Sequence, residues 1–180
     1  MIPYQQNAIV AAIVAPAPVQ PAPTLDALAS RIAGKPVHVI CETWSTYKAD
    51  PVAASIASQR NGAYPMGYAE PWHGTFTMGA DACTAVEYEL IDHPSGAGLP
   101  GGLGYVEDTR AVFTFFHESE HLAQYPDGTW SDEHVTDCRA IAAESVVLPE
   151  LGLPSERVSW LHDAALAIHS LSPAPYAGPC

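Results

Sequence analysis

The stretch that most limits how this chain can fold is residues 107–125, which contains neither Gly nor Pro. Glu107 and Asp108 fall where a helix dipole favours negative charge. Residues 126–128, Pro-Asp-Gly, form a strong turn pattern directly afterwards. Apolar side chains recur within the stretch at helical spacings: Val112, Phe115, Phe116 and Leu122. The sequence therefore predicts one long helix that ends near Tyr125.

This predicted helix carries the run His117-Glu118-Ser119-Glu120-His121. Because residues four apart stack on one helix face, His117 and His121 can present two imidazoles to one metal ion. Glu118 lies roughly a third of a turn away, where it can deprotonate a metal-activated water rather than bind the metal. The alternative is that both histidines are ordinary helix residues.

A third protein ligand is needed, because catalytic zinc usually takes three protein groups and leaves one position for water. Glu133 is the candidate, in the first turn of a second helix that we expect Ser131 to cap. Asp137 lies one turn further along the same face, where it can accept the outer N–H of a ligand imidazole. Without the first motif, Asp137 would be interpreted as a solvated helix charge. The apolar residues expected in this second helix are Val135, Ile141, Ala142 and Val146.

The pattern His-Glu-x-x-His followed by Glu-x-x-x-Asp resembles that of the gluzincin metallopeptidases. The resemblance implies that His117, His121 and Glu133 are zinc ligands. It also implies that Glu118 is the general base and that Asp137 orients a ligand. The short separation between the two halves is similar to that of the compact minigluzincins.

Residues 132–140, Asp-Glu-His-Val-Thr-Asp-Cys-Arg-Ala, also resemble a run found in small, mostly uncharacterised actinobacterial zincin-like proteins. That likeness extends from about Val37 to the final residues and includes an early pair of cysteines. The two motifs carry its specificity.

The four cysteines lie outside any close metal-ligand spacing and permit three pairings. We expect Cys41 to pair with Cys83 and Cys138 with Cys180, which would tie the tail to the helix that bears Glu133. Cys138 is five residues from Glu133 and so points away from the predicted metal. Free buried thiols are the alternative, and an extracytoplasmic or virion-associated location follows only if the disulfides form.

Composition narrows the function further. With 7 Lys and Arg against 20 Asp and Glu, the net charge is −13, so a nucleic-acid backbone would be repelled. Residues 24–180 have the length and apolar content of a single domain. Residues 1–23 are predicted to be an apolar, Pro-rich arm that docks on a partner or on its own domain. Its apolar run is too short to span a bilayer, and an atypical export signal is the alternative.

Local patterns predict the remaining elements. The Gly-rich loop 94–104 lacks a phosphate-binding pattern and is expected to form a lip beside the motif helix. A strand remains possible where the helix near Asp81 is predicted. The other predictions are a helix capped by Thr24 and stopped by Gly34, a strand at 37–41, a helix from Asp50 to Gln59, paired strands at 66–70 and 75–78, a helix from Asp81 through Leu90, and a last helix from about Ser155.

These observations predict an α+β, zincin-like domain, in which a small sheet packs on the motif helix and further helices follow on the C-terminal side. The expected function is zinc-dependent hydrolysis of a peptide bond in a peptide or protein substrate, with an amidase of cell-wall peptides as a variant. An oxyanion donor is also required. The candidates are His162, Tyr125 and His134, in that order, and His169 lies two turns beyond His162.

The alternative from another functional class is a non-catalytic zinc protein, such as a structural or attachment component of a virion. Such a site would be closed by a fourth ligand, for which His134 and His162 are candidates.

Overall fold

The computed structural model describes residues 24–92, 105–172, 176 and 178–180. The predicted arm at 1–23 and the predicted lip at 94–104 lie outside these residues. In chain order the main elements are α1 (Leu25–Ala33), β1 (His38–Glu42), α2 (Trp44–Ala49), α3 (Pro51–Gln59), β2 (Gly67–Glu70), β3 (Thr75–Gly79), α4 (Ala80–Glu87), α5 (Tyr105–Gln124), α6 (Glu133–Glu150) and α7 (Ser155–Ser170). Two short turns follow helices: a π-helical turn at Tyr88–Asp92 and a 3-10 turn at Tyr125–Asp127.

The three strands form one small sheet in the order β1-β3-β2. β1 runs parallel to β3, with His38 opposite Thr75, whereas β2 pairs with β3 in the antiparallel direction, with Gly67 opposite Met78. The predicted pairing of residues 66–70 with 75–78 is therefore confirmed. β2 forms an edge of this sheet, and within the described residues no further strand pairs with its outer side.

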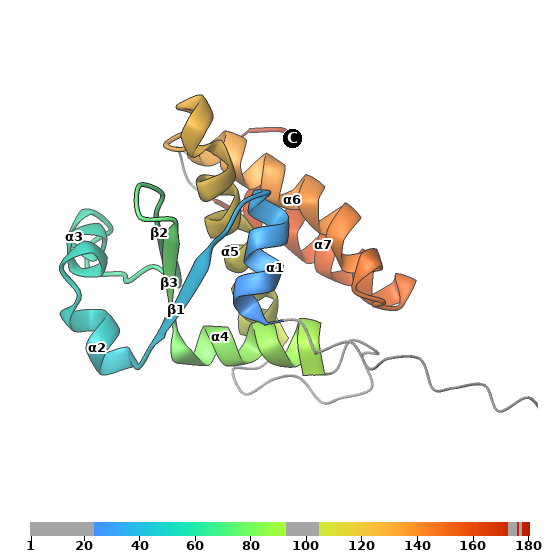
Figure 1. The fold of residues 1–180 in the computed structure, drawn as a ribbon, viewed down its shortest axis with the longest axis horizontal. Coiled ribbons are helices and arrows are strands. Elements are labelled where there is room, and N and C mark those ends of the chain that lie inside the picture. Colours follow the sequence, from blue (N-terminus) through green and yellow to red (C-terminus); the bar gives the residue numbers. More distant parts are fainter. Residues whose placement is uncertain (1–23, 93–104, 173–175, 177) are drawn as a thin grey trace, which may run out of the picture.

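Helix α5 lies at the centre of the molecule, between the sheet with α1 and the pair α6 and α7 (Figure 1). Phe115 and Phe116 on this helix are fully buried, and the ring of Phe76 on β3 meets Phe115 edge-on at 5.4 Å. Burial of a large apolar side chain contributes about 1.5–3 kcal/mol, so this layer fixes the motif helix against the sheet. The architecture is α+β, as the sequence predicts.

Several predicted helix ends are confirmed by their hydrogen bonds. The hydroxyl of Thr24 accepts from the amide of Ala27, and Gly34 ends α1 in the left-handed conformation with a φ of 67°. Asp50 likewise caps α3 through the amides of Val52 and Ala53. The segment after Gly79 is a helix and not the alternative strand.

The cap of α6 differs from the prediction. Asp132, rather than Ser131, accepts a hydrogen bond from the amide of Val135 at 3.1 Å. Both residue types are good caps, so the sequence alone does not decide between neighbours. The short helix α2 was not predicted.

The buried face of α6 is unusually polar. Thr136, Asp137 and Glu144 are almost fully buried, whereas Val146, predicted as part of the apolar pattern, is 60 % exposed. An apolar periodicity therefore describes this helix poorly. Buried polar groups need partners, and on this face they belong largely to the site described below.

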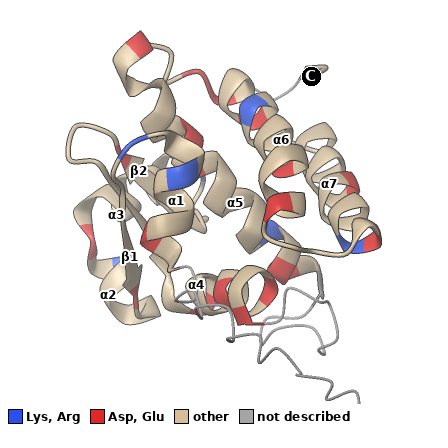
Figure 2. Ribbon diagram, turned by 45° about the vertical axis from the view of Figure 1, so that its right-hand side comes forward, with Lys and Arg blue, Asp and Glu red and all other residues tan. Residues whose placement is uncertain are grey.

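The two predicted disulfides are present, and the alternative of free thiols is wrong. Cys41 on β1 pairs with Cys83 on α4, and Cys138 on α6 pairs with Cys180, with Cα atoms 6.0 Å and 5.2 Å apart. Acidic residues occur on many helices and basic ones are sparse (Figure 2). Within the described part of the chain, no helix has both the length and the apolar character needed to cross a membrane.

Candidate metal centre and cleft

His117 and His121 lie on successive turns of α5, with ring centroids 4.5 Å apart, and both are largely buried. The Nδ1 atom of His117 donates to Oδ1 of Asp137 at 2.7 Å, and Nδ1 of His121 donates to the carbonyl of Trp130 at 2.6 Å. Because each Nδ1 is held by an acceptor, each Nε2 remains as the atom that can bind a metal.

Glu133, in the first turn of α6, supplies the third donor. Its Oε2 lies 3.1 Å from Nε2 of His117 and 3.4 Å from Nε2 of His121. The three donor atoms lie within 4.8 Å of one another, close enough to bind a single ion. Two imidazole nitrogens and one carboxylate oxygen are donors that zinc commonly uses in catalytic sites, so these residues fit that metal.

The charges of this group stabilise one another. Burial lowers the pKa of His117, but hydrogen bonds to Asp137 and Glu133 outweigh this effect and raise it to about 10. Burial likewise raises the pKa of Glu133, and the hydrogen bonds from His117 and His121 outweigh it and hold the pKa well below its usual range. A cation at this position would replace protons, so metal binding is expected to release them.

Asp137 connects this group to α7. It is 2 % exposed; Oδ1 accepts from His117, and Oδ2 accepts from Nδ1 of His169 at 2.8 Å. Of the two histidines on α7, His162 and His169, it is His169 that reaches the site, where it donates a hydrogen bond to Asp137.

Glu118 lies one residue from His117; it is also buried and lines the cleft. Burial raises its pKa, opposed by the charges of His117 and His121. Among the residues that the structure describes, Glu118 forms no salt bridge. A buried carboxylate with a raised pKa and no fixed partner is suited to proton transfer.

Gly67 allows β2 to approach Glu118 closely. A Cβ atom at this position would lie 3.2 Å from Cγ of Glu118, 3.1 Å from Cγ2 of Thr114 and 3.2 Å from Cγ of Met78. Any larger residue would therefore press on the side chain of Glu118. The sequence pattern does not predict this contact, because it depends on how the sheet packs on α5.

An open cleft of about 1090 Å³ contains this group of residues. Its floor is α5, one wall is formed by β2 and the segment before it, and the other by the start of α6 and the chain terminus. The side chains that shape it include Arg60, Tyr64, Phe113, Trp130 and Tyr176. A cleft of this size admits a peptide-sized ligand.

Tyr176 and Arg60 are cleft residues that sequence analysis missed. The Arg60 guanidinium donates a hydrogen bond to Oη of Tyr176 and lies 5.7 Å from its ring centroid. The tyrosine ring is 6.2 Å from that of His117. Burial raises the pKa of Tyr176, and the negative charge of Glu133 adds to the effect, so its hydroxyl stays protonated and can donate.

The three predicted oxyanion donors lie elsewhere. His162, His134 and Tyr125 are not among the described residues that line the cleft. His162 precedes His169 by two helical turns, about 10 Å along α7, which separates it from Asp137. His134 instead contacts the Tyr176 carbonyl at 3.2 Å, and Tyr125 packs on Trp130 with centroids 6.2 Å apart. Of the residues that the structure describes, the cleft lining thus brings together the metal donors and Glu118 but not His162, whose predicted catalytic role stays a prediction.

Comparison of the chain with known protein families, with curated proteins and with solved structures finds no match.

Proposed function

We propose that this protein is a zinc-dependent hydrolase of peptide bonds. The observation that carries the proposal is that His117, His121 and Glu133 converge in an open cleft directly beside the buried carboxylate of Glu118. Metal donors that share a cleft with a carboxylate that forms no salt bridge to any described residue are the parts required for metal-assisted hydrolysis.

His117, His121 and Glu133 would hold the zinc ion. When bound, zinc supplies a Lewis acid that polarises water and the substrate carbonyl. Asp137 and the Trp130 carbonyl keep the two imidazoles in the tautomer that binds metal. The protein therefore meets the ion with ligands already oriented.

Glu118 acts as the general base. Its carboxylate accepts a proton from the attacking water and then transfers that proton to the amide nitrogen that leaves. Its buried environment supports this role, because a raised pKa brings the carboxylate closer to the value at which it can both accept and return a proton.

Tyr176 stabilises the negative charge that develops on the carbonyl oxygen. Tyr176 lines the cleft with its ring 6.2 Å from that of His117, and Arg60 both orients the protonated hydroxyl and adds positive charge. A hydrogen-bond donor held in place before the reaction is the usual means of stabilising such an oxyanion.

The substrate is an extended peptide that pairs with β2. This edge strand lines the cleft, and its outer side, which no other described strand occupies, can add a further strand by backbone hydrogen bonding. Aromatic rings of Tyr64 and Trp130 border the same cleft and favour apolar side chains in the peptide. The two disulfides favour an oxidising compartment for this activity.

The residues that line the cleft favour an enzyme over a purely structural zinc protein. A structural site is closed by a fourth protein ligand, and the two candidates named for that position, His134 and His162, lie outside the cleft lining. The cleft also leaves room beside the three donors, which a substrate and water require.

The test compares the zinc-loaded protein with its Glu118→Gln variant in a broad peptide-library digest. The amide keeps the shape of the side chain but accepts no proton, so the variant should retain zinc and lose nearly all cleavage. Glu120→Gln is the matched control, because Glu120 lies on the same helix but pairs with Arg139. Absence of cleavage by the fully zinc-loaded native protein would reject the proposal.

A further inference from the structure

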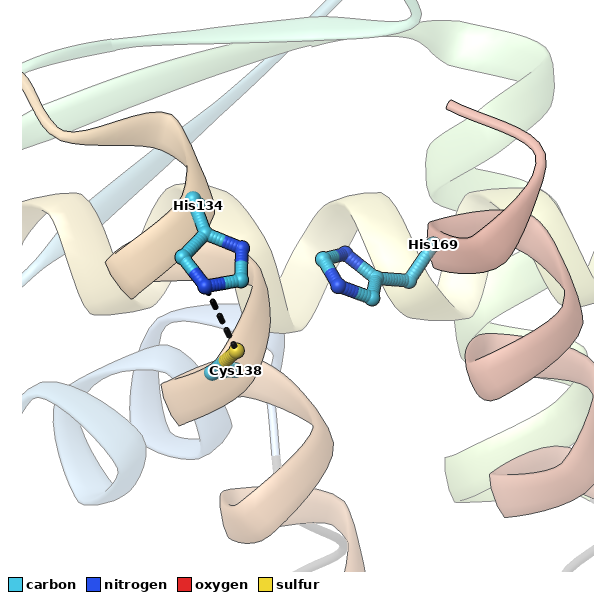
Figure 3. Close-up of side chains that lie close together, drawn as sticks. All are labelled: His134, Cys138 and His169. Carbon is cyan, nitrogen blue, oxygen red and sulfur yellow. Dashed lines mark hydrogen bonds between the residues drawn. The ribbon is translucent and has the colours of Figure 1, made fainter. Parts of the chain in front are cut away.

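A second group of potential metal donors lies on the other side of Asp137. His134 and Cys138 occupy successive turns of α6, and His169 faces them from α7 (Figure 3). Their donor atoms lie within 4.8 Å of one another. Sγ of Cys138 is 3.9 Å from Nε2 of His134, and the two imidazole rings stack with centroids 5.4 Å apart. This group shares no residue with the His117, His121 and Glu133 group.

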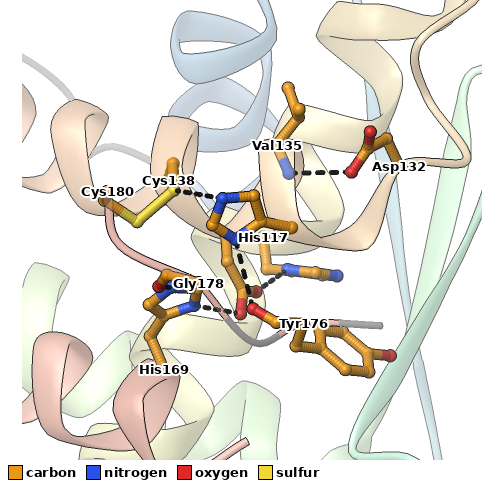
Figure 4. Close-up of a disulfide and its surroundings, with 10 residues drawn as sticks. His117, Asp132, Val135, Cys138, His169, Tyr176, Gly178 and Cys180 are labelled. Carbon is orange, nitrogen blue, oxygen red and sulfur yellow. Dashed lines mark hydrogen bonds and ion pairs between the residues drawn. A yellow bond between two sulfur atoms is a disulfide. The ribbon is translucent and has the colours of Figure 1, made fainter. Parts of the chain in front are cut away.

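C-terminal residues are bonded or hydrogen-bonded to all three of these donor residues. Cys138 is bonded to Cys180, the carbonyl of Tyr176 accepts from Nδ1 of His134, and the carbonyl of Gly178 accepts from Nε2 of His169 at 2.8 Å (Figure 4). Gly178 also packs directly on the ring of His134, since a Cβ atom there would lie 2.7 Å from Cε1.

Opening of one covalent bond would expose the whole group. Reduction of the Cys138–Cys180 disulfide by a thiol reductant consumes two thiols, which become a disulfide, and leaves two cysteine thiols on the protein. The bond is what ties Cys180 to α6, so its loss frees Sγ of Cys138 and releases the segment that covers His169. Nδ1 of His169 remains fixed by Asp137, which leaves Nε2 to bind a metal.

We propose that the reduced protein binds a second zinc ion through Cys138, His134 and His169. One thiolate and two imidazoles are donors that zinc takes readily, whereas magnesium and calcium prefer oxygen ligands. When the ion binds, Cys138 loses its thiol proton and Nε2 of His169 loses the proton that it donates to the Gly178 carbonyl, and both protons pass to solvent. The disulfide and the second metal ion are thus mutually exclusive occupants of the same three residues. This proposal does not depend on hydrolytic activity.

The test titrates Co²⁺, a spectroscopic substitute for zinc, into the Cys180→Ser variant without reductant. This variant leaves Cys138 as a free thiol and keeps the Cys41–Cys83 bond closed. It should bind two Co²⁺ ions and develop the near-ultraviolet absorption of thiolate-to-cobalt charge transfer. The native oxidised protein should bind one ion without that absorption, since the first group contains no sulfur ligand.

The double variant Cys138→Ser/Cys180→Ser is the matched control. Its C-terminal residues are likewise no longer bonded to α6, but the Cys138 thiol is missing. It should bind one ion and show no charge-transfer absorption. His134→Ala in the Cys180→Ser background should weaken the second ion by at least about tenfold and leave the first unchanged.

A folded Cys180→Ser protein with a titratable thiol and no charge-transfer absorption at saturating Co²⁺ would overturn the proposal. If that variant does not fold, the native protein and the double variant are compared after reduction with a phosphine, which adds no competing thiol. The Cys41 and Cys83 thiols are then common to both, so equal absorption would also overturn it. If the Cys180→Ser variant binds one Co²⁺ ion and shows the charge-transfer absorption, the result would support the site at Cys138, His134 and His169. It would reject the site at His117, His121 and Glu133.

Discussion

Nδ1 of His117 lies 2.7 Å from Oδ1 of the buried carboxylate of Asp137. The second oxygen of the same carboxylate accepts from His169, so Asp137 is fixed between α5 and α7. A carboxylate that is itself held in place fixes both the tautomer and the ring orientation of the imidazole it contacts. The metal affinity of the site should therefore depend on a residue that does not touch the metal.

The Asp137→Asn variant should bind zinc about 10 to 100-fold more weakly, because the amide holds His117 less firmly in the metal-binding tautomer. The measurement is a competition titration with a chelator of known affinity. Asp132→Asn is the control, since Asp132 caps the same helix and its side chain accepts from the Val135 amide rather than from a histidine of the candidate site. Equal affinities for the native protein and Asp137→Asn would remove Asp137 from the support of the site.

Removal of the tyrosine hydroxyl should lower turnover without affecting the metal. Tyr176→Phe is expected to reduce kcat by about 100-fold, the usual loss for one oxyanion donor, while zinc affinity and KM change little. Tyr64→Phe is the matched control, because this tyrosine lines the same cleft but its hydroxyl donates to the Lys48 carbonyl. A loss of similar size in both variants would indicate a general effect on the cleft instead.

Gly67→Ala should impair the proposed hydrolysis by shifting Glu118, the proposed general base. The added methyl group meets Cγ of Glu118 at 3.2 Å, so the carboxylate must shift, and we expect kcat/KM to fall by about tenfold with zinc still bound. Gly79→Ala in the same sheet has no atom within 4 Å of the added Cβ and should leave kcat/KM unchanged. Native activity in Gly67→Ala would show that Glu118 tolerates the contact.

Glu144 should make stability depend on pH. Burial raises its pKa well above the ordinary value of 4.5, so it folds in its neutral form. The stability that the neutral Glu144 contributes to the folded protein is fully present below pH 4.5, the ordinary pKa. It is lost as the pH rises toward the folded-state pKa. From about pH 4 to about pH 8, the free energy of unfolding of Glu144→Gln should therefore rise relative to that of the native protein.

Urea titrations of both proteins at the two pH values measure this difference. Glu150→Gln on the same helix is the control, because Glu150 is half-exposed and pairs with Arg31 at the surface. A constant difference between Glu144→Gln and the native protein across the pH range would mean that Glu144 does not titrate in this way.

The sequence predicted the parts of the candidate site that depend on local geometry. The i, i+4 spacing puts His117 and His121 on one face of any helix, and Glu133 and Asp137 share a face for the same reason. The structure brings these two faces together, as the predicted crossing of the helices requires.

The remaining parts depend on packing, which periodicity does not record. His162 and His169 share one face of α7, and only the crossing point of α6 and α7 decides that His169 meets Asp137. Tyr176 reaches the cleft because the chain end is tied to α6, far from it in sequence. The close approach at Gly67 likewise follows from how the sheet packs on α5. The sequence pattern predicts none of these three contacts, because each joins elements that are separate in the chain.

The two disulfides also bear on how the protein recovers from full reduction and unfolding. Each native bond joins cysteines 42 residues apart, and both bonds in either of the other two pairings would close longer loops. The entropy lost on closing a loop grows with its length, so chain statistics alone favour the native set by about 1 kcal/mol. Oxidative refolding should thus begin with a bias toward the correct bonds before any native contact has formed, and few mispaired molecules should need reshuffling.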